Sequence, residues 1–450
     1  MKNLLILFLI IPFCTAIGQT KDSIAKQNDT TKKLPFAIAK EKRMTDEDIA
    51  NKPEGTYVTG VPDISSDPVN GFGYGVGGYL YFNGKKTDPF FNYTPYRAKI
   101  DIALFNTTKS QREIIAKLDV PYILNSKWRL RVEGGYESNP NLLYFGKTES
   151  TLNKLSYYDN IGAIPQLKSG VSYSEYSDNF LVGDNKLYHN YNKEEFILNI
   201  SGERSLYEGK MRLLLGYELA SVKIRTFQGN SLLQLDANAG QILGLGSSLI
   251  GLGQVGIIYD TRDLESDPSK GIFAELTNEL SLKALGSSFN FNKTYGHISV
   301  YKNLIAKYPK RLVLAGRAGL GYTAWDAPFF EYQDQWSSEG SVEGLGGSKT
   351  LRGYKQSRFL GRVMSINNLE LRYRFAQLNF LKQHFAFSTL PFIDAGAVWD
   401  DFNTIKSFKN FRVSEGLGLR IAWNVNTILR FDYAVSQEDR QFFFSLAQMF

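Results

Sequence analysis

The sequence predicts an all-β fold, a transmembrane antiparallel β-barrel of sixteen strands. Three observations predict it: apolar and polar residues alternate with a period of two, aromatic residues make up 14% of the chain, and signals for crossover helices are absent. A period of two sends successive side chains to opposite faces of a strand. A barrel wall in a membrane needs that pattern, with lipid on one face and a polar lumen on the other.

The composition agrees with this fold. The 450 residues include 26 Tyr, 31 Phe and 40 Gly but only one Cys, and the net charge is +7. Many aromatics and glycines with almost no cysteine are typical of β architectures without disulfides or metal–thiolate sites. No stretch approaches the roughly eighteen consecutive apolar residues of a transmembrane helix. If this chain crosses a membrane, it therefore crosses with strands.

The N-terminus has the pattern of an export signal. In residues 1–18, Lys2 precedes an apolar run, and small residues stand before the expected cleavage site, so we predict a signal peptide. Cleavage would also remove Cys14. Residues 19–54 are polar and mixed in charge, which predicts a periplasmic leader or linker, or a short plug. They are too few for a substantial folded domain.

Residues 55–450 are predicted to form the barrel. Leu369, Leu371 and Tyr373 alternate with Glu370 and Arg372, and other segments repeat this arrangement. A soluble sandwich would expose the polar face and bury the apolar one. Several charges opposite a Leu/Tyr/Phe row, in strand after strand, are better explained by a charged lumen and a lipid-facing belt.

The candidate strands number sixteen, an even number that places both chain ends in the periplasm. If the first strand runs outward, the short links lie on the periplasmic side and the long segments 138–190, 225–248 and 324–360 lie outside. Pro62 weakens the first strand and suits an edge. The predicted strands are 56–66, 70–82, 95–106, 111–120, 127–137, 191–203, 210–224, 249–262, 271–283, 292–303, 311–323, 361–375, 385–399, 412–423, 427–436 and 441–450.

The long connection between strands eleven and twelve carries the strongest candidate for function. It contains Glu343-Gly-Leu-Gly-Gly-Ser-Lys-Thr-Leu-Arg-Gly-Tyr354, whose glycines permit tight turns. A phosphate cradle would need a strand–loop–helix context that is missing here. If the loop folds inward, Arg352 needs carboxylates, and Glu370 and Asp394 are the expected partners on the wall. The alternative is a solvated loop arginine.

The last predicted strand ends the chain with an aromatic residue. Phe442, Phe444, Leu446 and Phe450 are expected on one face of a closing strand, with Gln448 interrupting that face. A C-terminal aromatic residue resembles the sorting signal of outer-membrane barrels.

Several motifs together resemble one family, the BamA/TamA-like outer-membrane assembly-factor superfamily (bacterial surface antigen family). The resemblance covers roughly 55–450. It is carried by the loop motif Leu351-Arg352-Gly353-Tyr354, the wall residues Glu370, Asp394 and Gly396, the mid-barrel residues Asp260, Arg262, Asp263 and Gly271, and the closing strand, in which Ala447 replaces the usual glycine.

The resemblance implies a mechanism. In this family the loop arginine is held inside the lumen by the wall carboxylates, and a weak seam between first and last strands opens to admit client strands by β-augmentation. Members that recruit clients carry periplasmic POTRA domains, which residues 19–54 cannot hold. We therefore expect a barrel-only member, in which a partner supplies recruitment or the role is narrower.

The expected function is assistance with insertion, assembly or translocation of proteins at the outer membrane of a Gram-negative bacterium. The alternative is a passive channel or structural barrel with no client. Expected partners are outer-membrane lipid and client outer-membrane proteins, or an assembly complex supplying periplasmic domains, but no nucleic acid. We expect no cofactor, no metal and no catalytic residue, because His189, His297 and His384 are the only histidines and no triad is indicated.

Overall fold

The computed structural model describes residues 33–67, 69–147, 149–159, 165–180, 187–227, 229–307, 310–381, 383–405 and 410–450. The predicted signal peptide, residues 1–18, lies outside them. Within these ranges no helix has both the length and the apolar character to span a bilayer.

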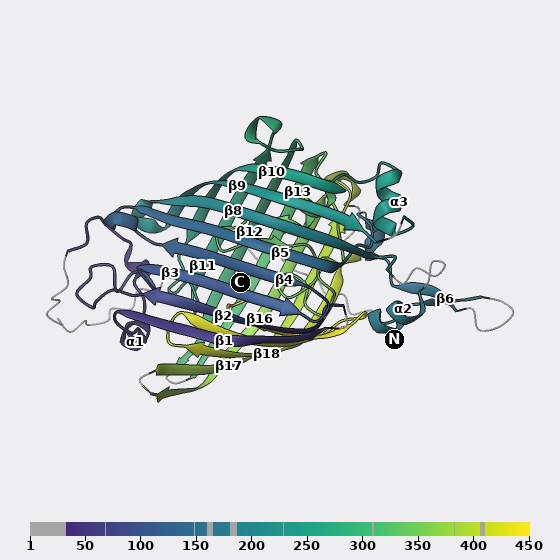
Figure 1. The fold of residues 1–450 in the computed structure, drawn as a ribbon. Helices are drawn as coiled ribbons and strands as arrows, with labels where there is room; N and C mark the ends of the chain where they lie inside the picture. Colours follow the sequence, from purple (N-terminus) through teal and green to yellow (C-terminus); the bar gives the residue numbers. More distant parts are fainter. Residues whose placement is uncertain are drawn as a thin grey trace.

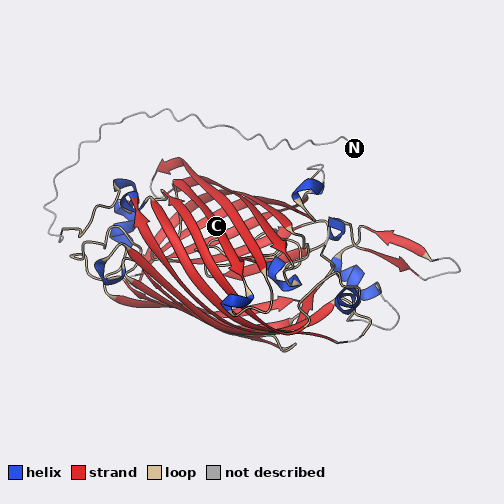
Figure 2. Ribbon diagram, turned by 90° about the horizontal axis from the view of Figure 1, so that it is seen from above, coloured by secondary structure: helices blue, strands red, loops and turns tan. Residues whose placement is uncertain are grey.

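Sixteen strands form one antiparallel sheet in which each strand pairs with the next along the chain, which confirms the predicted fold class (Figure 1). Figure 2 shows the sheet curling into a barrel. The strands are β1 (Thr56–Asp67), β2 (Gly71–Phe82), β3 (Ala98–Thr107), β4 (Arg112–Val120), β5 (Trp128–Leu143), β8 (Asn190–Leu206), β9 (Met211–Thr226), β10 (Gly246–Asp260), β11 (Gly271–Ser281), β12 (Phe291–Lys307), β13 (Lys310–Trp325), β16 (Val363–Phe380), β17 (Gln383–Trp399), β18 (Arg412–Trp423), β19 (Thr427–Val435) and β20 (Arg440–Ser445).

The remaining elements are short and lie in the connections or in the segment that precedes β1. Two small hairpins pair β6 (Ser156–Asp159) with β7 (Gln166–Ser169) and β14 (Asp334–Gln335) with β15 (Val342–Glu343). The α-helices are α1 (Asp46–Asn51), α2 (Tyr173–Asn179) and α3 (Leu232–Asn238). The 3-10 turns are η1 (Lys40–Lys42), η2 (Ile123–Asn125), η3 (Glu149–Leu152), η4 (Tyr207–Gly209), η5 (Lys283–Leu285), η6 (Phe329–Gln333) and η7 (Phe402–Thr404).

The connections separate into two groups at opposite ends of the barrel. Helix α1 lies at one end, and α2, α3 and β6 lie at the other (Figure 1). The short links, such as 261–270 and 424–426, share the end of α1, whereas the long connections 144–189 and 326–362 leave from the other end. We call the end of α1 the periplasmic mouth, following the predicted orientation.

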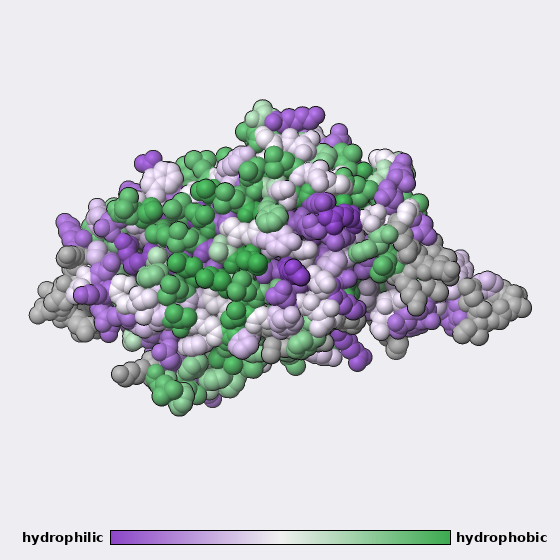
Figure 3. All heavy atoms as spheres, in the orientation of Figure 1, coloured by the Kyte–Doolittle hydropathy of each residue, from purple (hydrophilic) through white to green (hydrophobic). Residues whose placement is uncertain are grey.

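Opposite faces of the strands differ in exposure as the alternation predicts. Leu369 and Leu371 are 42% and 36% exposed, whereas Glu370 between them is fully buried. Apolar side chains cover much of the strand surface in Figure 3. Outward aliphatic side chains and inward charges fit a wall between lipid and a filled polar interior.

The two ends of the sheet meet through side chains. The order begins at β1 and ends at β20, and in the described part of the chain these two strands form no ladder with each other. Instead the Oγ1 atoms of Thr59 and Thr427 lie 2.6 Å apart, and the Tyr79 hydroxyl donates to the Leu446 carbonyl at 3.1 Å. We call the junction of β1 with β19 and β20 the seam.

The closing strand is shorter than predicted. Strand β20 ends at Ser445, so the prediction of a strand over 441–450 is wrong for the last five residues. Continued alternation would send Gln448 to the lipid-facing side with Phe442 and Phe444. In the structure the segment leaves the sheet, and the Gln448 amide finds polar partners in the lumen: its Oε1 accepts from Arg420 Nε at 3.0 Å and its Nε2 donates to Asp267 Oδ1 at 3.2 Å.

Candidate functional site

Arg352 lies at the centre of the lumenal site and has no solvent exposure. Its guanidinium makes a bidentate contact with Asp394, with Nε–Oδ2 and Nη2–Oδ1 distances of 2.8 Å. Its Nη1 also donates to Glu370 Oε1 at 2.9 Å and to Asp432 Oδ2 at 3.0 Å. The structure therefore places the loop arginine against both wall carboxylates named from the sequence, and against a third.

The carboxylates have further partners of their own. Asp394 accepts from Asn368 Nδ2 at 2.8 Å, Glu370 from Arg372 Nε at 2.9 Å, and Asp432 from Arg420 Nη1 at 2.6 Å. Phe392 covers the Arg352 guanidinium, whose carbon lies 3.4 Å from the ring centroid. Buried charges are tolerated only when paired and hydrogen-bonded in this way.

Glycines let the loop approach the wall. Gly353 has a φ of +88°, which favours glycine, and a Cβ there would lie 3.1 Å from the Val435 backbone. Its carbonyl accepts from the Ser436 hydroxyl at 2.6 Å. Gly396 on β17 lies directly beneath the Leu345 side chain, so it leaves room for the loop.

The apolar members of the loop motif form a core of their own. Leu351 and Tyr354 are buried with Leu345, Phe359 and Trp399. The Tyr354 and Phe359 rings meet edge to face, with centroids 5.2 Å apart. The loop is therefore fixed to the wall by apolar packing as well as by the ion pairs.

A residue of the mid-barrel motif contacts a second part of the 326–362 connection, the long connection that carries Arg352. Arg262, in the link after β10, donates from its backbone N and its Nε to Asp260 Oδ1 at 3.0 and 3.1 Å. Its Nη1 donates to Glu339 of the long connection at 3.2 Å. The connection therefore runs along the lumen from the Arg352 cluster to a link at the periplasmic mouth.

The other mid-barrel residues shape that link. Asp263 Oδ1 accepts from the backbone N of Ser269 and of Lys270 at 2.9 and 3.2 Å. Gly271 has a φ of +108°, and any Cβ there would collide with the Thr261 carbonyl. The residue types at 263 and 271 are thus dictated by the turn.

A comparison with protein-family models matches residues 121–450 to the Omp85 superfamily domain. The chain belongs to the Omp85 superfamily. This confirms the resemblance read from the motifs and places the protein among outer-membrane β-barrels. A second model, a domain of unknown function (DUF5982), matches residues 34–97. A search of curated proteins found no match.

Solved structures of BamA and of CdiB are similar to this chain. BamA from Haemophilus ducreyi lacking POTRA domains 1–3 is 16% identical, with a TM-score of 0.49 over 87% of this chain and 69% of that one. CdiB from Escherichia coli is 11% identical, with a TM-score of 0.49 over 88% and 61%. CdiB from Acinetobacter baumannii is 9% identical, with a TM-score of 0.46 over 87% and 58%. The chain thus spans less than two thirds of either CdiB.

The segment that precedes β1 packs against links and strand ends at the periplasmic mouth of this Omp85 barrel. We call residues 36–52 the N-terminal cap. Met44 is buried against Leu264 and Val425, which lie in two different periplasmic links. Lys42 Nζ lies 3.0 Å from Asp260 Oδ2, and the Glu47 carboxylate lies 2.9 Å from Arg374 Nη2.

The closing segment of the Omp85 barrel divides into two parts. Phe442 is 66% exposed on the outer face, as expected for a lipid-facing residue. Leu446 instead lies against Gly77 on the inner face of β2, and Phe450 contacts the lumenal cluster of Tyr301, Val313 and Ala315. The prediction that all four apolar residues share one face is therefore wrong for Leu446 and Phe450. Phe444 remains in β20 and packs on Phe431, with ring centroids 5.0 Å apart.

Proposed function

We propose that this Omp85 barrel assists the insertion, assembly or translocation of proteins at the outer membrane of a Gram-negative bacterium, by offering its seam to incoming strands. The observation that carries the proposal is the unequal pair of edges at the seam. β1 has 12 residues and β20 has 6, so β20 is too short to lie along the whole edge of β1. Unpaired strand edges are templates for pairing with another chain.

The contacts across the seam support opening. They are side-chain hydrogen bonds near the periplasmic mouth, such as Thr59 with Thr427 at 2.6 Å and Asn426 Nδ2 with the Tyr57 hydroxyl at 2.7 Å. Each hydrogen bond contributes about 0.5–1.5 kcal/mol net. A continuous ladder, such as the one between β16 and β17, has many such bonds and is far harder to separate.

The contents of the lumen argue for a client at the seam rather than a solute in the lumen. The 326–362 connection, the N-terminal cap and the last five residues all occupy it, through the contacts of Arg352, Lys42 and Phe450. A passive channel would need these segments to leave. A structural barrel without a client would give no role to the open edge of β1.

In this proposal the barrel does not itself recruit client proteins. Client outer-membrane proteins, or an assembly complex that supplies periplasmic domains, are the proposed partners, with outer-membrane lipid around the wall. A pull-down of the native protein tests this directly: recovery with neither a client nor an assembly complex would contradict it.

A reversible lock of the seam tests the function. We expect T59C/T427C to form a disulfide, because the two hydroxyls are in contact. Oxidation should then reduce the outer-membrane level of client proteins in cells depleted of the native protein, and reductant should restore it. The matched control is S365C/A397C, which joins facing residues within the β16–β17 ladder. Full activity of the oxidised seam variant would refute the proposal.

A further inference from the structure

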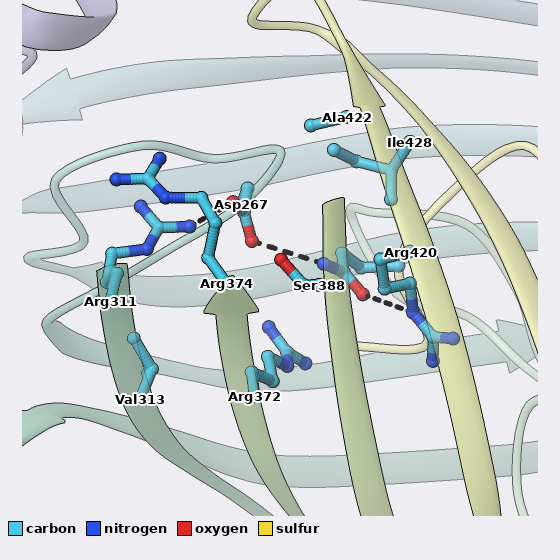
Figure 4. A pocket seen from close by; sticks show the side chains of 10 residues that line it. Asp267, Arg311, Val313, Arg372, Arg374, Ser388, Arg420, Ala422 and Ile428 are labelled. Atoms are coloured by element: carbon cyan, nitrogen blue, oxygen red, sulfur yellow. Dashed lines mark hydrogen bonds and ion pairs between the residues drawn. The ribbon is translucent and has the colours of Figure 1, made fainter. Parts of the chain in front are cut away.

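Two pockets of the barrel differ in size and in charge balance. The first lies in the lumen and has about 10 Å³ of free space, room for roughly one water molecule. Its charged lining residues are Asp267, Arg311, Arg372, Arg374 and Arg420 (Figure 4). Each of the four arginines forms an ion pair with a carboxylate, so this pocket is both small and neutralised.

The second pocket lies at the outer end of the barrel and has about 170 Å³ of free space. It lies where the 144–189 connection, the 326–362 connection and the turn between β19 and β20 meet. Pockets for drug-sized ligands measure about 300–1,000 Å³, so a ligand of this one is smaller. We call it the outer pocket, and its main lining residues are Lys154, Leu155, Val171, Tyr354, Arg412 and Glu438.

Two cations of the outer pocket have no carboxylate partner. Among the residues that the structure describes, neither Lys154 nor Arg412 forms an ion pair, and Arg412 Nε is buried without a hydrogen bond. The Glu438 carboxylate is already engaged, because Arg358 Nε and Nη2 donate to it at 2.9 and 3.1 Å. A buried N–H without a partner is costly, so the pocket favours an anionic group.

Hydrogen bonds hold the walls of the outer pocket in place. The Gly170 backbone N donates to the Leu155 carbonyl at 2.9 Å, which fixes the wall formed by the 144–189 connection. The Tyr173 backbone N donates to the Glu438 carbonyl at 2.7 Å, which joins this connection to the turn between β19 and β20. A pocket that is already formed reduces the entropic cost of binding.

The uncharged walls of the outer pocket suit a small ring that bears hydroxyl groups. Leu155 and Val171 contribute an aliphatic surface, and Tyr354 contributes an aromatic ring. Gln437 also lines the pocket, and its amide can both donate and accept hydrogen bonds. A sugar ring offers C–H groups to the apolar walls and hydroxyls to the amide.

We propose that the outer pocket binds an acidic monosaccharide unit, a sugar ring that carries a carboxylate or a phosphate. Arg412 and Lys154 bind the anionic group, and the apolar walls contact the ring. Because the pocket lies at the outer end of the barrel, the unit comes either from a free sugar or from a saccharide of the outer leaflet. The pocket does not include the seam, so this proposal does not rest on the proposed function.

Binding can be measured by calorimetry on the full chain refolded in detergent micelles. The probes are glucuronate and glucose 6-phosphate, compared with glucose and inorganic phosphate. Glucuronate should bind about tenfold more tightly than glucose, because glucose lacks the carboxylate for charge-assisted hydrogen bonds. Glucose 6-phosphate should bind more tightly than inorganic phosphate, because inorganic phosphate lacks the ring.

Arg412 provides the decisive comparison. R412Q should weaken the binding of glucuronate about tenfold, whereas R412K keeps the charge and should keep most of the affinity. The matched control, R225Q, removes an arginine near the outer end of β9 that is 48% exposed and pairs with Glu194, and it should bind like the wild type. If R412Q does not fold, K154Q replaces it, because Lys154 is exposed.

Bilayer nanodiscs distinguish the two sources of the sugar. If the unit belongs to a saccharide of the outer leaflet, wild type in discs that contain lipopolysaccharide should bind added glucuronate more weakly than in discs without it. Equal binding in the two kinds of disc would assign the pocket to a free acidic sugar.

Equal binding of glucuronate and glucose, or wild-type binding by both R412Q and K154Q, would overturn the site. Inorganic phosphate that binds as tightly as glucose 6-phosphate would overturn recognition of the ring and leave an adventitious ion only. None of these outcomes bears on seam opening, because the T59C/T427C assay measures client levels and this assay contains no client protein.

Discussion

Arg352 and Asp394 form a bidentate ion pair in which neither side chain is exposed to solvent. The pair joins the long connection to β17 across 42 residues of sequence, and the Arg352 backbone N also donates to the same carboxylate at 3.2 Å. It fixes both the position of the loop and the direction of its arginine.

We predict that R352A and D394N each destabilise the folded barrel by about 3–5 kcal/mol, because either change leaves a buried charge without its partner. The double variant should cost much less than the sum of the two, which is the sign of direct coupling. Urea unfolding in detergent micelles measures all three. The control is R225A, whose exposed pair with Glu194 should be worth about 1 kcal/mol or less. Additive effects would contradict the coupling.

The sequence predicts most of this arrangement because period-two alternation fixes which face a residue occupies. Glu370 and Asp394 are identifiable as inward, and a loop arginine needs inward acids. Asp432, the third carboxylate, also alternates with Phe431 and Tyr433. Its distance from the loop depends on barrel closure, so no local pattern selects it as a partner.

Two other features cannot be predicted from the period-two alternation, for a different reason. The contacts of the N-terminal cap come from links and strand ends far apart in the sequence, such as Leu264, Val425 and Arg374, which only the fold brings together. The turn after Ser445 takes the last five residues out of the ladder and brings the Gln448 side chain to polar partners in the lumen. Gln448, which interrupts the apolar row, is the one local signal for it.

The N-terminal cap should be held mainly by Met44. We expect M44A to undock it, because the substitution removes the side chain that is buried against Leu264 and Val425. Trypsin should then cleave after Lys42 and Arg43 faster than in the wild type, as followed by mass spectrometry. D46A is the control, because its side chain is 89% exposed and contributes little burial. Equal cleavage rates for M44A and the wild type would show that the cap is held elsewhere.

Acid should loosen the outer connection that contains His189. The ring stacks on Phe145 at 4.6 Å, lies 2.6 Å from the Tyr176 hydroxyl through Nε2, and faces Arg358 across Phe145. Burial lowers the pKa of His189 to about 4 from its usual 6.5. The unfolded segment therefore binds a proton before the folded one, so stability falls as the pH decreases from about 6.5 to about 4.

Hydrogen exchange of residues 165–180, corrected for the intrinsic effect of pH, measures this loosening. Exchange should rise between pH 7 and pH 5 in the wild type. H189F keeps an aromatic ring in place but cannot titrate, so its exchange should not change over that range. A pH response in H189F equal to that of the wild type would assign the effect to another group.

Gly77 controls how closely the closing segment approaches the inner face of β2. A Cβ at this position would lie 2.9 Å from Leu446 Cδ1, so a branched side chain must displace Leu446. We expect G77V to loosen the last five residues and to speed removal of Phe450 by a carboxypeptidase several-fold, because the tail then loses its contact at Leu446 and keeps those at Gln448 and Phe450. G134V is the control, since the nearest atom to its Cβ would be 4.0 Å away. Equal rates of Phe450 release in G77V and G134V would mean that Leu446 does not hold the tail, and that the lumenal contacts of Gln448 and Phe450 retain it.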